Sequence, residues 1–337
     1  MKKIVCVFII LLCVCTSGTT VLAKELIVGD QSSKVHEITI DGVMYSYLIS
    51  PDKKEVTILE ADTDKKFKTF RYPSKIKGKP VTKIGGWVNK PDCYTTLVEC
   101  KKLIVPSSVR TLHHGCFIRL KADEVVLPET IKTIPSFCFQ GSTIKKVNIP
   151  KKVKKINSYA FWECRKLKAV NLPDGLQKLG EYAFAGCQSI TKVTVPKKIT
   201  KLEDCSLCGC MSLKKITFKG KLTAIGGGAF CGTRLEKFTI PNTVKSIGDT
   251  AFAYCDKLKK IVIPKQVTVL KQQTFDRCKN LETVIIKAPS IRVERSVFRD
   301  CKKLKNLSLE KISWSAAHAF DGTPYAGQET EKGTTSA

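Results

Sequence analysis

Residues 153–173 read Val-Lys-Lys-Ile-Asn-Ser-Tyr-Ala-Phe-Trp-Glu-Cys-Arg-Lys-Leu-Lys-Ala-Val-Asn-Leu-Pro, and the same apolar spacing returns in residues 176–196. The phenylalanine of this stretch recurs every 22 or 23 residues, with one leucine in the series. These anchor positions are Phe117, Phe139, Phe161, Phe184, Leu207, Phe230, Phe252, Phe275, Phe298 and Phe320. A fixed period of this length predicts a repeat architecture in which each unit contacts only its neighbours.

An apolar triplet with the spacing L-x-x-V-x-I comes just before the end of each unit, as in Leu258, Ile261 and Ile263 before Pro264. Alternate residues on one face are typical of a strand, and the proline ends it because proline cannot donate to the ladder. Stacked units would place these strands about 4.8 Å apart in a parallel sheet. An apolar pair after the proline would fill the core from the opposite wall. No unit can bury its apolar residues alone, so we expect a solenoid of about ten coils.

The ends of the chain differ from the repeat. Residues 1–23 have a positive start, an apolar run from Ile4 to Cys15 and small residues before position 24, which is typical of a cleaved secretory signal peptide. Residues 24–80 contain alternating patterns at 40–47 and 56–59, which predict an N-terminal β capping module built on a hairpin. The solenoid is expected over residues 81–324, and residues 325–337 form a polar tail that we expect to be disordered.

The pattern V-x-x-I-G-x-x-A-F-x-x-C-x-x-L-x-x-V-x-I-P, over about residues 81–324, resembles the BspA-like subfamily of leucine-rich repeat proteins. The expected fold is therefore an α/β-type, leucine-rich-repeat-like stack of about ten 22–23-residue coils, with a parallel sheet on one face and the N-terminal β-hairpin module as a cap. The resemblance implies a secreted or cell-surface protein of a bacterium or protozoan, in a family associated with adhesion to host matrix proteins, coaggregation and recognition by host receptors. It leaves the ligand open, because function resides in surface residues placed on the fold.

Six cysteines lie three residues after an anchor, at Cys164, Cys187, Cys210, Cys255, Cys278 and Cys301. A residue type tied to the phase of the repeat predicts a buried packing position, where a thiol acts as a small apolar group. The run Cys205-x-x-Cys208-x-Cys210 superficially suggests a metal site, but no histidine is near and the three cysteines occupy different phases of one coil. We therefore predict neither a metal nor a cofactor.

Two cysteine pairs on adjacent coils are candidate disulfides. Cys116 and Cys138 each precede their anchor, and Cys208 and Cys231 each follow theirs. Stacking would bring the Cα atoms of each pair to about 5 Å, which is within the range of a disulfide. An anaerobic habitat would leave the same thiols reduced.

The sequence shows no catalytic constellation. His113 and His114 stand close to Cys116, but Cys116 occupies a position that is alanine in several coils and is therefore expected to be buried and inert. We find no phosphate-binding glycine loop and no other workable set of acid, base and nucleophile, so we expect a non-enzymatic protein.

The formal net charge is +28, nearly all of it from lysine, and polyanions are the partner class that such a charge favours. Four consecutive coils carry lysine four residues before the position of the coil-closing proline, and three of them carry threonine two residues later. This column consists of Lys192, Lys215, Lys237 and Lys260 with Thr194, Thr217 and Thr239, and Lys102 and Lys146 share its phase in earlier coils. In a leucine-rich repeat these side chains face outward from the sheet, at intervals of about 5 Å. The alternative is that the lysines simply form a soluble face that discourages strand pairing.

Two functions remain open from the sequence. The first is an extracellular adhesin-like binding module that contacts acidic glycans, other polyanions or host proteins through the sheet face. The second is a structural protein held to anionic envelope polymers by charge, which would elute as salt shortens the Debye length. We expect a monomer, no transmembrane segment after signal cleavage, and no specific nucleic-acid partner.

Overall fold

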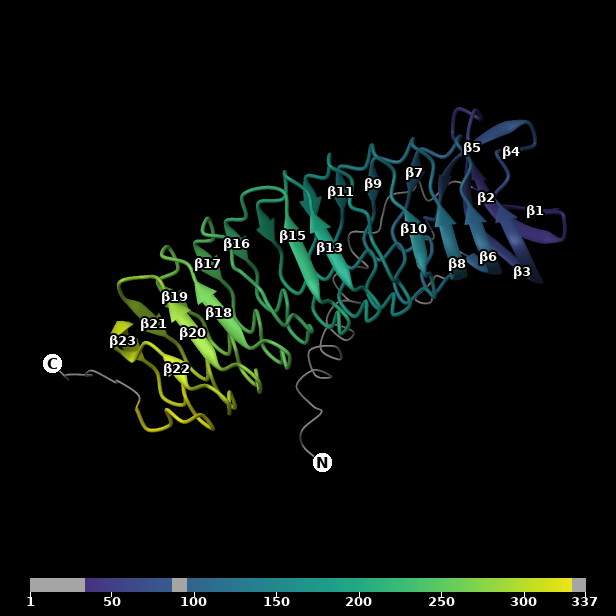
Figure 1. The fold of residues 1–337 in the computed structure, drawn as a ribbon. Helices are drawn as coiled ribbons and strands as arrows, with labels where there is room; N and C mark the ends of the chain where they lie inside the picture. Colours follow the sequence, from purple (N-terminus) through teal and green to yellow (C-terminus); the bar gives the residue numbers. More distant parts are fainter. Residues whose placement is uncertain (1–33, 87–95, 329–337) are drawn as a thin grey trace.

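The computed structural model describes residues 34–86 and 96–328. The predicted signal peptide, Cys93 and most of the predicted tail lie outside these residues. The described chain forms an elongated β-solenoid of about 11 turns, with its N-terminal strands at one end and the last coil at the other (Figure 1). The predicted solenoid with its parallel sheet is confirmed.

One wall of the solenoid, which we call the front ladder, is built from the strands that precede the coil-ending proline or its replacement. Its parallel members are β3 (Val56–Arg71), β6 (Thr96–Ile104), β8 (Lys121–Val126), β10 (Lys146–Asn148), β13 (Lys192–Val195), β15 (Lys215–Phe218), β18 (Lys260–Ile263), β20 (Thr283–Ile286) and β22 (Asn306–Leu307). Buried and exposed residues alternate along them, as the sequence pattern requires: in β13, Val193 and Val195 are buried and Lys192 and Thr194 are exposed.

The opposite wall, the back ladder, forms where the apolar pair after the proline was expected to pack. Its members are β5 (Lys79–Ile84), β7 (Thr111–Leu112), β9 (Thr133–Ile134), β11 (Lys155–Ile156), β12 (Lys178–Leu179), β14 (Lys201–Leu202), β16 (Ala224–Ile225), β17 (Ser246–Ile247), β19 (Val269–Leu270), β21 (Ile291–Val293) and β23 (Ile312–Ser315). Most of these strands have two residues, and they pair in parallel within four groups: β5 with β7, β9-β11-β12, β14-β16-β17 and β19-β21-β23. The solenoid therefore has parallel sheets on two walls and not on one.

Helix is almost absent, in contrast to the α/β-type expectation. The described chain contains a single 3-10 turn, η1 (Leu309–Lys311), and no helix that is long and apolar enough to span a membrane. The reason is the short distance between elements: Ile156 ends β11 and the turn at Tyr159 follows three residues later. So short a connection cannot accommodate a nucleated α-helix.

The N-terminal module begins with the hairpin of β1 (His36–Ile40) and β2 (Val43–Ile49), which pair antiparallel. Strand β2 pairs antiparallel with β3, which in turn pairs parallel with β6, and β5 pairs parallel with β7. A short strand, β4 (Lys75–Ile76), pairs antiparallel with β5. The module therefore supplies the first strand of both ladders. At the other end, Tyr325, the first residue of the predicted tail, donates a hydrogen bond to the carbonyl of Lys305 at 2.9 Å.

The anchor residues form a column through the core. All nine phenylalanines of the series are fully buried, and their rings stack in two runs, Phe117 to Phe184 and Phe230 to Phe320, with centroids 5.0 to 5.8 Å apart. Leu207 separates the two runs and is also fully buried. Within each run, a ring therefore contacts the anchor rings of the adjacent coils, which couples neighbouring coils.

The turn that carries each anchor has an unusual backbone. In all ten coils the residue two before the anchor has φ between 51° and 65°, and the residue two after it has φ between 53° and 72°. Some of these residues are glycine, but Tyr182 and Arg277 also take this left-handed conformation, which costs a non-glycine residue about 1 kcal/mol. The backbone hydrogen bonds gained along the turn offset that cost: the amides of Tyr159, Phe161 and Glu163 donate to carbonyls of the next coil at 2.8 to 2.9 Å.

The six cysteines that lie three residues after an anchor are buried and form no disulfide. Each has an equivalent hydrogen-bond partner. Each sulfur donates to the anchor carbonyl of the preceding coil, at 2.9 to 3.3 Å, as Cys187 does to Phe161. Ser142 occupies the same phase and donates to the carbonyl of Phe117 at 3.0 Å. The packing prediction is confirmed, and the thiol in addition makes a hydrogen bond between coils, to a carbonyl that also accepts a backbone amide of its own turn, as Phe161 does from Cys164 at 3.1 Å.

Phe252→Ala is expected to lower the free energy of unfolding by about 3–5 kcal/mol, because it removes a buried ring that contacts Phe230 and Phe275. Met211→Ala, at a side chain that is 49% exposed, is the control and should change it by less than about 0.5 kcal/mol. Chemical denaturation measures both. A Phe252→Ala protein as stable as the parent would show that the phase of the core is wrongly assigned.

Cys187→Ala is expected to cost about 1–2 kcal/mol, since it removes the hydrogen bond to Phe161 and leaves a small cavity. Cys187→Ser should lose less, because a hydroxyl at this phase can donate to the same carbonyl, as Ser142 does. Denaturation curves of the two variants, measured under reducing conditions, decide the matter. A serine variant no more stable than the alanine variant would contradict a hydrogen-bonding role for the thiol.

Candidate functional site

The lysine column lies on the exposed side of the front ladder. In the pairing of β13 with β15, Lys192 is opposite Lys215 and Thr194 is opposite Thr217. Further along, Lys237 is opposite Lys260 in a parallel bridge. All four lysines and the three threonines of the column are exposed. The strand alternation that buries Val193 thus fixes the outward direction of Lys192 and Thr194.

The column is two pairs and not one continuous ladder. In the described chain no strand pairing joins Lys215 to Lys237. The β13–β15 pair and the Lys237–Lys260 bridge lie in the same wall but are not paired with each other. The distance from the anchor also changes here: Lys237 follows its anchor Phe230 by seven residues, whereas Lys215 follows Leu207 by eight. At this point Phe218 and Phe238 pack edge to face, with centroids 6.4 Å apart.

The four lysines carry uncompensated charge. None of Lys192, Lys215, Lys237 and Lys260 forms an ion pair with a residue that the structure describes. Exposed Lys168, Lys214 and Lys259 stand one position upstream on the same wall. Like charges at such short spacing raise the local positive potential and attract anions.

Lys102 and Lys146, the two earlier members of the phase, are placed differently. Both approach Glu124, at 3.7 and 3.8 Å, because β8 lies between β6 and β10 and presents Glu124 in their register. Their charge is therefore partly neutralised within the protein. The uncompensated part of the column is confined to the coils from Lys192 to Lys260.

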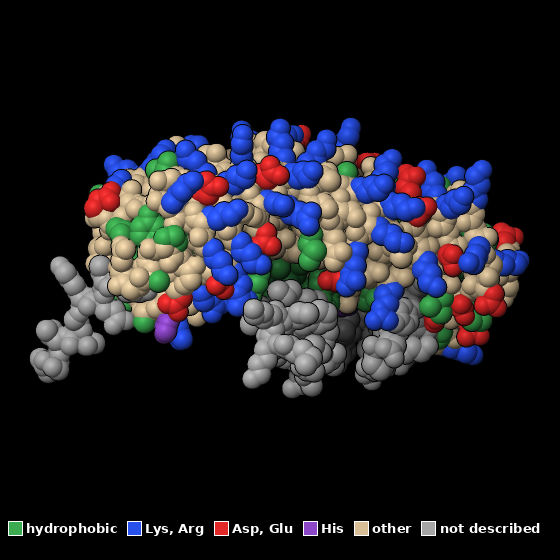
Figure 2. Space-filling view, turned by 60° about the horizontal axis from the view of Figure 1, so that its bottom comes forward, with side chains coloured by type: hydrophobic (Ala, Val, Ile, Leu, Met, Phe, Trp, Pro, Cys, Tyr) green, Lys and Arg blue, Asp and Glu red, His purple; other side chains and the backbone are tan. Residues whose placement is uncertain are grey.

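Lysine and arginine side chains are spread along the visible face of the molecule, with acidic side chains scattered among them (Figure 2). Some exposed lysines lie on the strands of the back ladder, where the repeat pattern did not predict a strand. Lys155 is opposite Lys178 in the pairing of β11 with β12, and both are exposed. In the sequence, the back-ladder lysines can be found because each directly precedes a buried aliphatic residue at the same position of the repeat, as at Lys155–Ile156 and Lys178–Leu179. Lys201, in the next coil, forms an ion pair with Glu203 at 2.6 Å.

The candidate disulfides are free thiols in this structure. The sulfur atoms of Cys116 and Cys138 lie 3.4 Å apart and are fully buried. Cys208 and Cys231 are half-buried, and the sulfur of Cys208 interacts with both Cys231 and Cys205. Oxidation of either pair stays a prediction.

Burial shifts the pKa of several cysteine and histidine side chains. Burial raises the pKa of the Cys138 and Cys164 thiols well above the ordinary value, which keeps them protonated. Burial lowers the pKa of His113 and His114 below the ordinary value, so both are neutral near pH 7. Among the described residues, no group of three histidine, cysteine or acidic side chains is arranged to hold a metal ion.

The stacked parallel strands and the exposed column define the class of protein: a leucine-rich repeat solenoid. The family model for the BspA-type leucine-rich repeat region matches residues 90–213 and 201–325, in six copies. These matches span more than half of the chain, and the chain belongs to this family. No curated protein matches the chain.

Solved structures with this fold come from several bacteria. A leucine-rich repeat protein from Bacteroides ovatus is 19% identical with a TM-score of 0.58, over 85% of this chain and 92% of that one. One from Eubacterium ventriosum is also 19% identical, with a TM-score of 0.49, over 90% and 98%. The pneumococcal vaccine antigen PcpA is 15% identical, with a TM-score of 0.42, over 82% and 96%. The likeness to the Bacteroides ovatus protein supports the fold.

Proposed function

We propose that this chain is a secreted or cell-surface, non-enzymatic binding protein whose front ladder contacts polyanionic glycans or acidic host proteins. The observation that carries the proposal is a set of four exposed lysines on successive coils, none of which forms an ion pair with a residue in 34–86 or 96–328. The apolar run in residues 1–23 supports export.

The geometry suits an extended anion better than a compact one. Paired strands lie about 4.8 Å apart, so an acidic chain laid across them meets one lysine per coil without bending sharply. Exposed threonines beside the lysines offer hydroxyl groups to sulfate or carboxylate oxygens. Each contact is weak on its own, because an exposed ion pair contributes about 0–1 kcal/mol, but several act together along one chain.

The second candidate is a structural protein held to anionic wall polymers by charge alone. The observation that favours it is the spread of exposed lysine over both ladders and the turns, within a net charge of +28. In the first candidate function, the position of the lysines determines binding to the anion. In the second, the total charge of the protein determines it. A pair of variants with the same change in net charge separates them.

The decisive variant reverses Lys192, Lys215, Lys237 and Lys260 to glutamate. It should remain folded, because these side chains point away from the core, and its binding to heparin should fall by at least tenfold at low salt, since four attractive contacts become repulsive. Binding to immobilised heparin, measured at two salt concentrations, gives the affinity, and circular dichroism checks the fold.

The matched control reverses Lys151, Lys152, Lys197 and Lys198, which are exposed on the turns that follow Pro150 and Pro196. It makes the same change in net charge away from the front ladder. We expect a clearly smaller loss of heparin binding. Equal losses in the two variants would show that net charge, and not the column, governs binding.

A further inference from the structure

Strand β3 is longer than its neighbours and does not run evenly beside β6. Asp62 is opposite Leu97, but the next pair joins Lys66 to Glu99. Between these two pairs β3 therefore has two more residues than β6. The extra residues form a bulge, and bulges are frequent next to binding sites because they redirect side chains. The bulge lies where the N-terminal module meets the solenoid.

The bulge is tied to the hairpin of the N-terminal module. Thr63 donates through its Oγ1 to the carbonyl of Gly42 at 2.9 Å, and the Lys65 ammonium lies 3.4 Å from the carbonyl of Asp41. Asp41 and Gly42 form the β1–β2 turn, both with positive φ. The hairpin therefore supports the bulge as well as pairing with β3.

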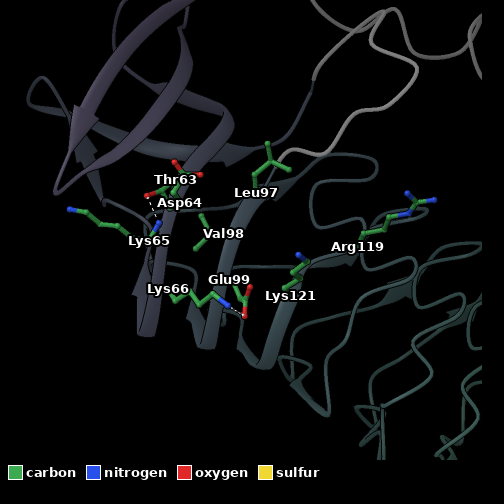
Figure 3. Close-up of a pocket in the computed structure, with 9 residues that line it drawn as sticks. All are labelled: Thr63, Asp64, Lys65, Lys66, Leu97, Val98, Glu99, Arg119 and Lys121. Atoms are coloured by element: carbon green, nitrogen blue, oxygen red, sulfur yellow. Dashed lines mark hydrogen bonds and ion pairs between the residues drawn. The ribbon is translucent and has the colours of Figure 1, made fainter.

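A hollow of about 360 Å³ opens between the bulge, β6 and the start of β8 (Figure 3). This volume is at the lower end of the range for small-ligand sites. Figure 3 shows Lys66, Glu99 and Lys121 side by side across three neighbouring strands, with Leu97 farther along β6. Lys65, Asp64 and Arg119 complete its charged lining.

The lining favours an anion that has an apolar part. It contains four cationic and two acidic side chains, and one of the acids, Glu99, is held by Lys66 at 3.1 Å. Lys121 is exposed, lies in the strand next to Glu99, and forms no ion pair with any residue in the described ranges. Leu97, whose side chain is 45% exposed, gives the hollow an apolar wall at the same end of β6.

We propose that this hollow binds the acidic end group of a sugar, a carboxylate or sulfate carried on a ring that also bears an N-acetyl group. Lys121 meets the oxyanion, and Leu97 contacts the acetyl methyl. The site is separate from the lysine column of the front ladder, because none of its lining residues belongs to that column. It gives the N-terminal module a binding function in addition to its place at the end of the solenoid.

Titration followed by NMR tests the proposal with three probes: N-acetylneuraminic acid, N-acetylglucosamine 6-sulfate and neutral N-acetylglucosamine. We expect saturable binding of at least one acidic sugar and much weaker binding of the neutral one. The acidic probe that binds identifies carboxylate or sulfate as the source of the anion. Failure of both acidic sugars to bind, or equal binding of the neutral sugar, would overturn the proposal.

Variants locate the binding. Lys121→Gln should weaken the acidic probe about fivefold, which is the upper range for one exposed ion pair, whereas Lys302→Gln removes the same charge from an exposed lysine of the last coils and should have no effect. Equal weakening by both would refute the assigned site. The protein with the four-lysine reversal should bind the sugar as the parent does, so a failure of the front-ladder proposal and a failure of this one are distinguishable.

Discussion

The register between neighbouring coils is the constraint on which the rest of this structure depends. Backbone amides of each anchor turn donate to the next coil, as Phe161 does to Ala183, and residues of equal phase are thereby brought to the spacing of paired strands. A phenylalanine at one phase becomes a stacked column, a cysteine at another becomes a row of thiol hydrogen bonds, and a lysine at a third becomes a column of surface charge. Core and candidate binding surface therefore follow from the same hydrogen bonds.

The sequence was sufficient for features that depend only on phase. The buried anchors, the buried thiols such as Cys187 and the outward direction of Lys192 all follow from position within a 22–23-residue unit. Features that depend on conformation were not predictable in the same way. The left-handed turn holds glycine in some coils and tyrosine or arginine in others, so no residue type marks it. The two-residue strands of the back ladder are shorter than any pattern that alternation can reveal.

Features that depend on the side chains or the length of a neighbouring coil could not be predicted from the repeat pattern either. Lys102 and Lys146 share the phase of the lysine column, yet Glu124 on the strand between them partly neutralises their charge. The strand pairing breaks between Lys215 and Lys237, and β3 bulges because it has two extra residues relative to β6. Each is a local irregularity in an otherwise regular stack. In this protein the surface irregularities, more than the repeat itself, distinguish one region from another.

The central claim is that the register concentrates binding on one column of lysines, and lysine footprinting tests it most directly. The folded protein would be acetylated with and without heparin at low salt, and the modified sites quantified by mass spectrometry. The account predicts that heparin protects Lys192, Lys215, Lys237 and Lys260 strongly, and Lys151, Lys152, Lys197 and Lys198 much less. Equal protection of the two sets would contradict it, because binding would then follow net charge and not the geometry of the solenoid.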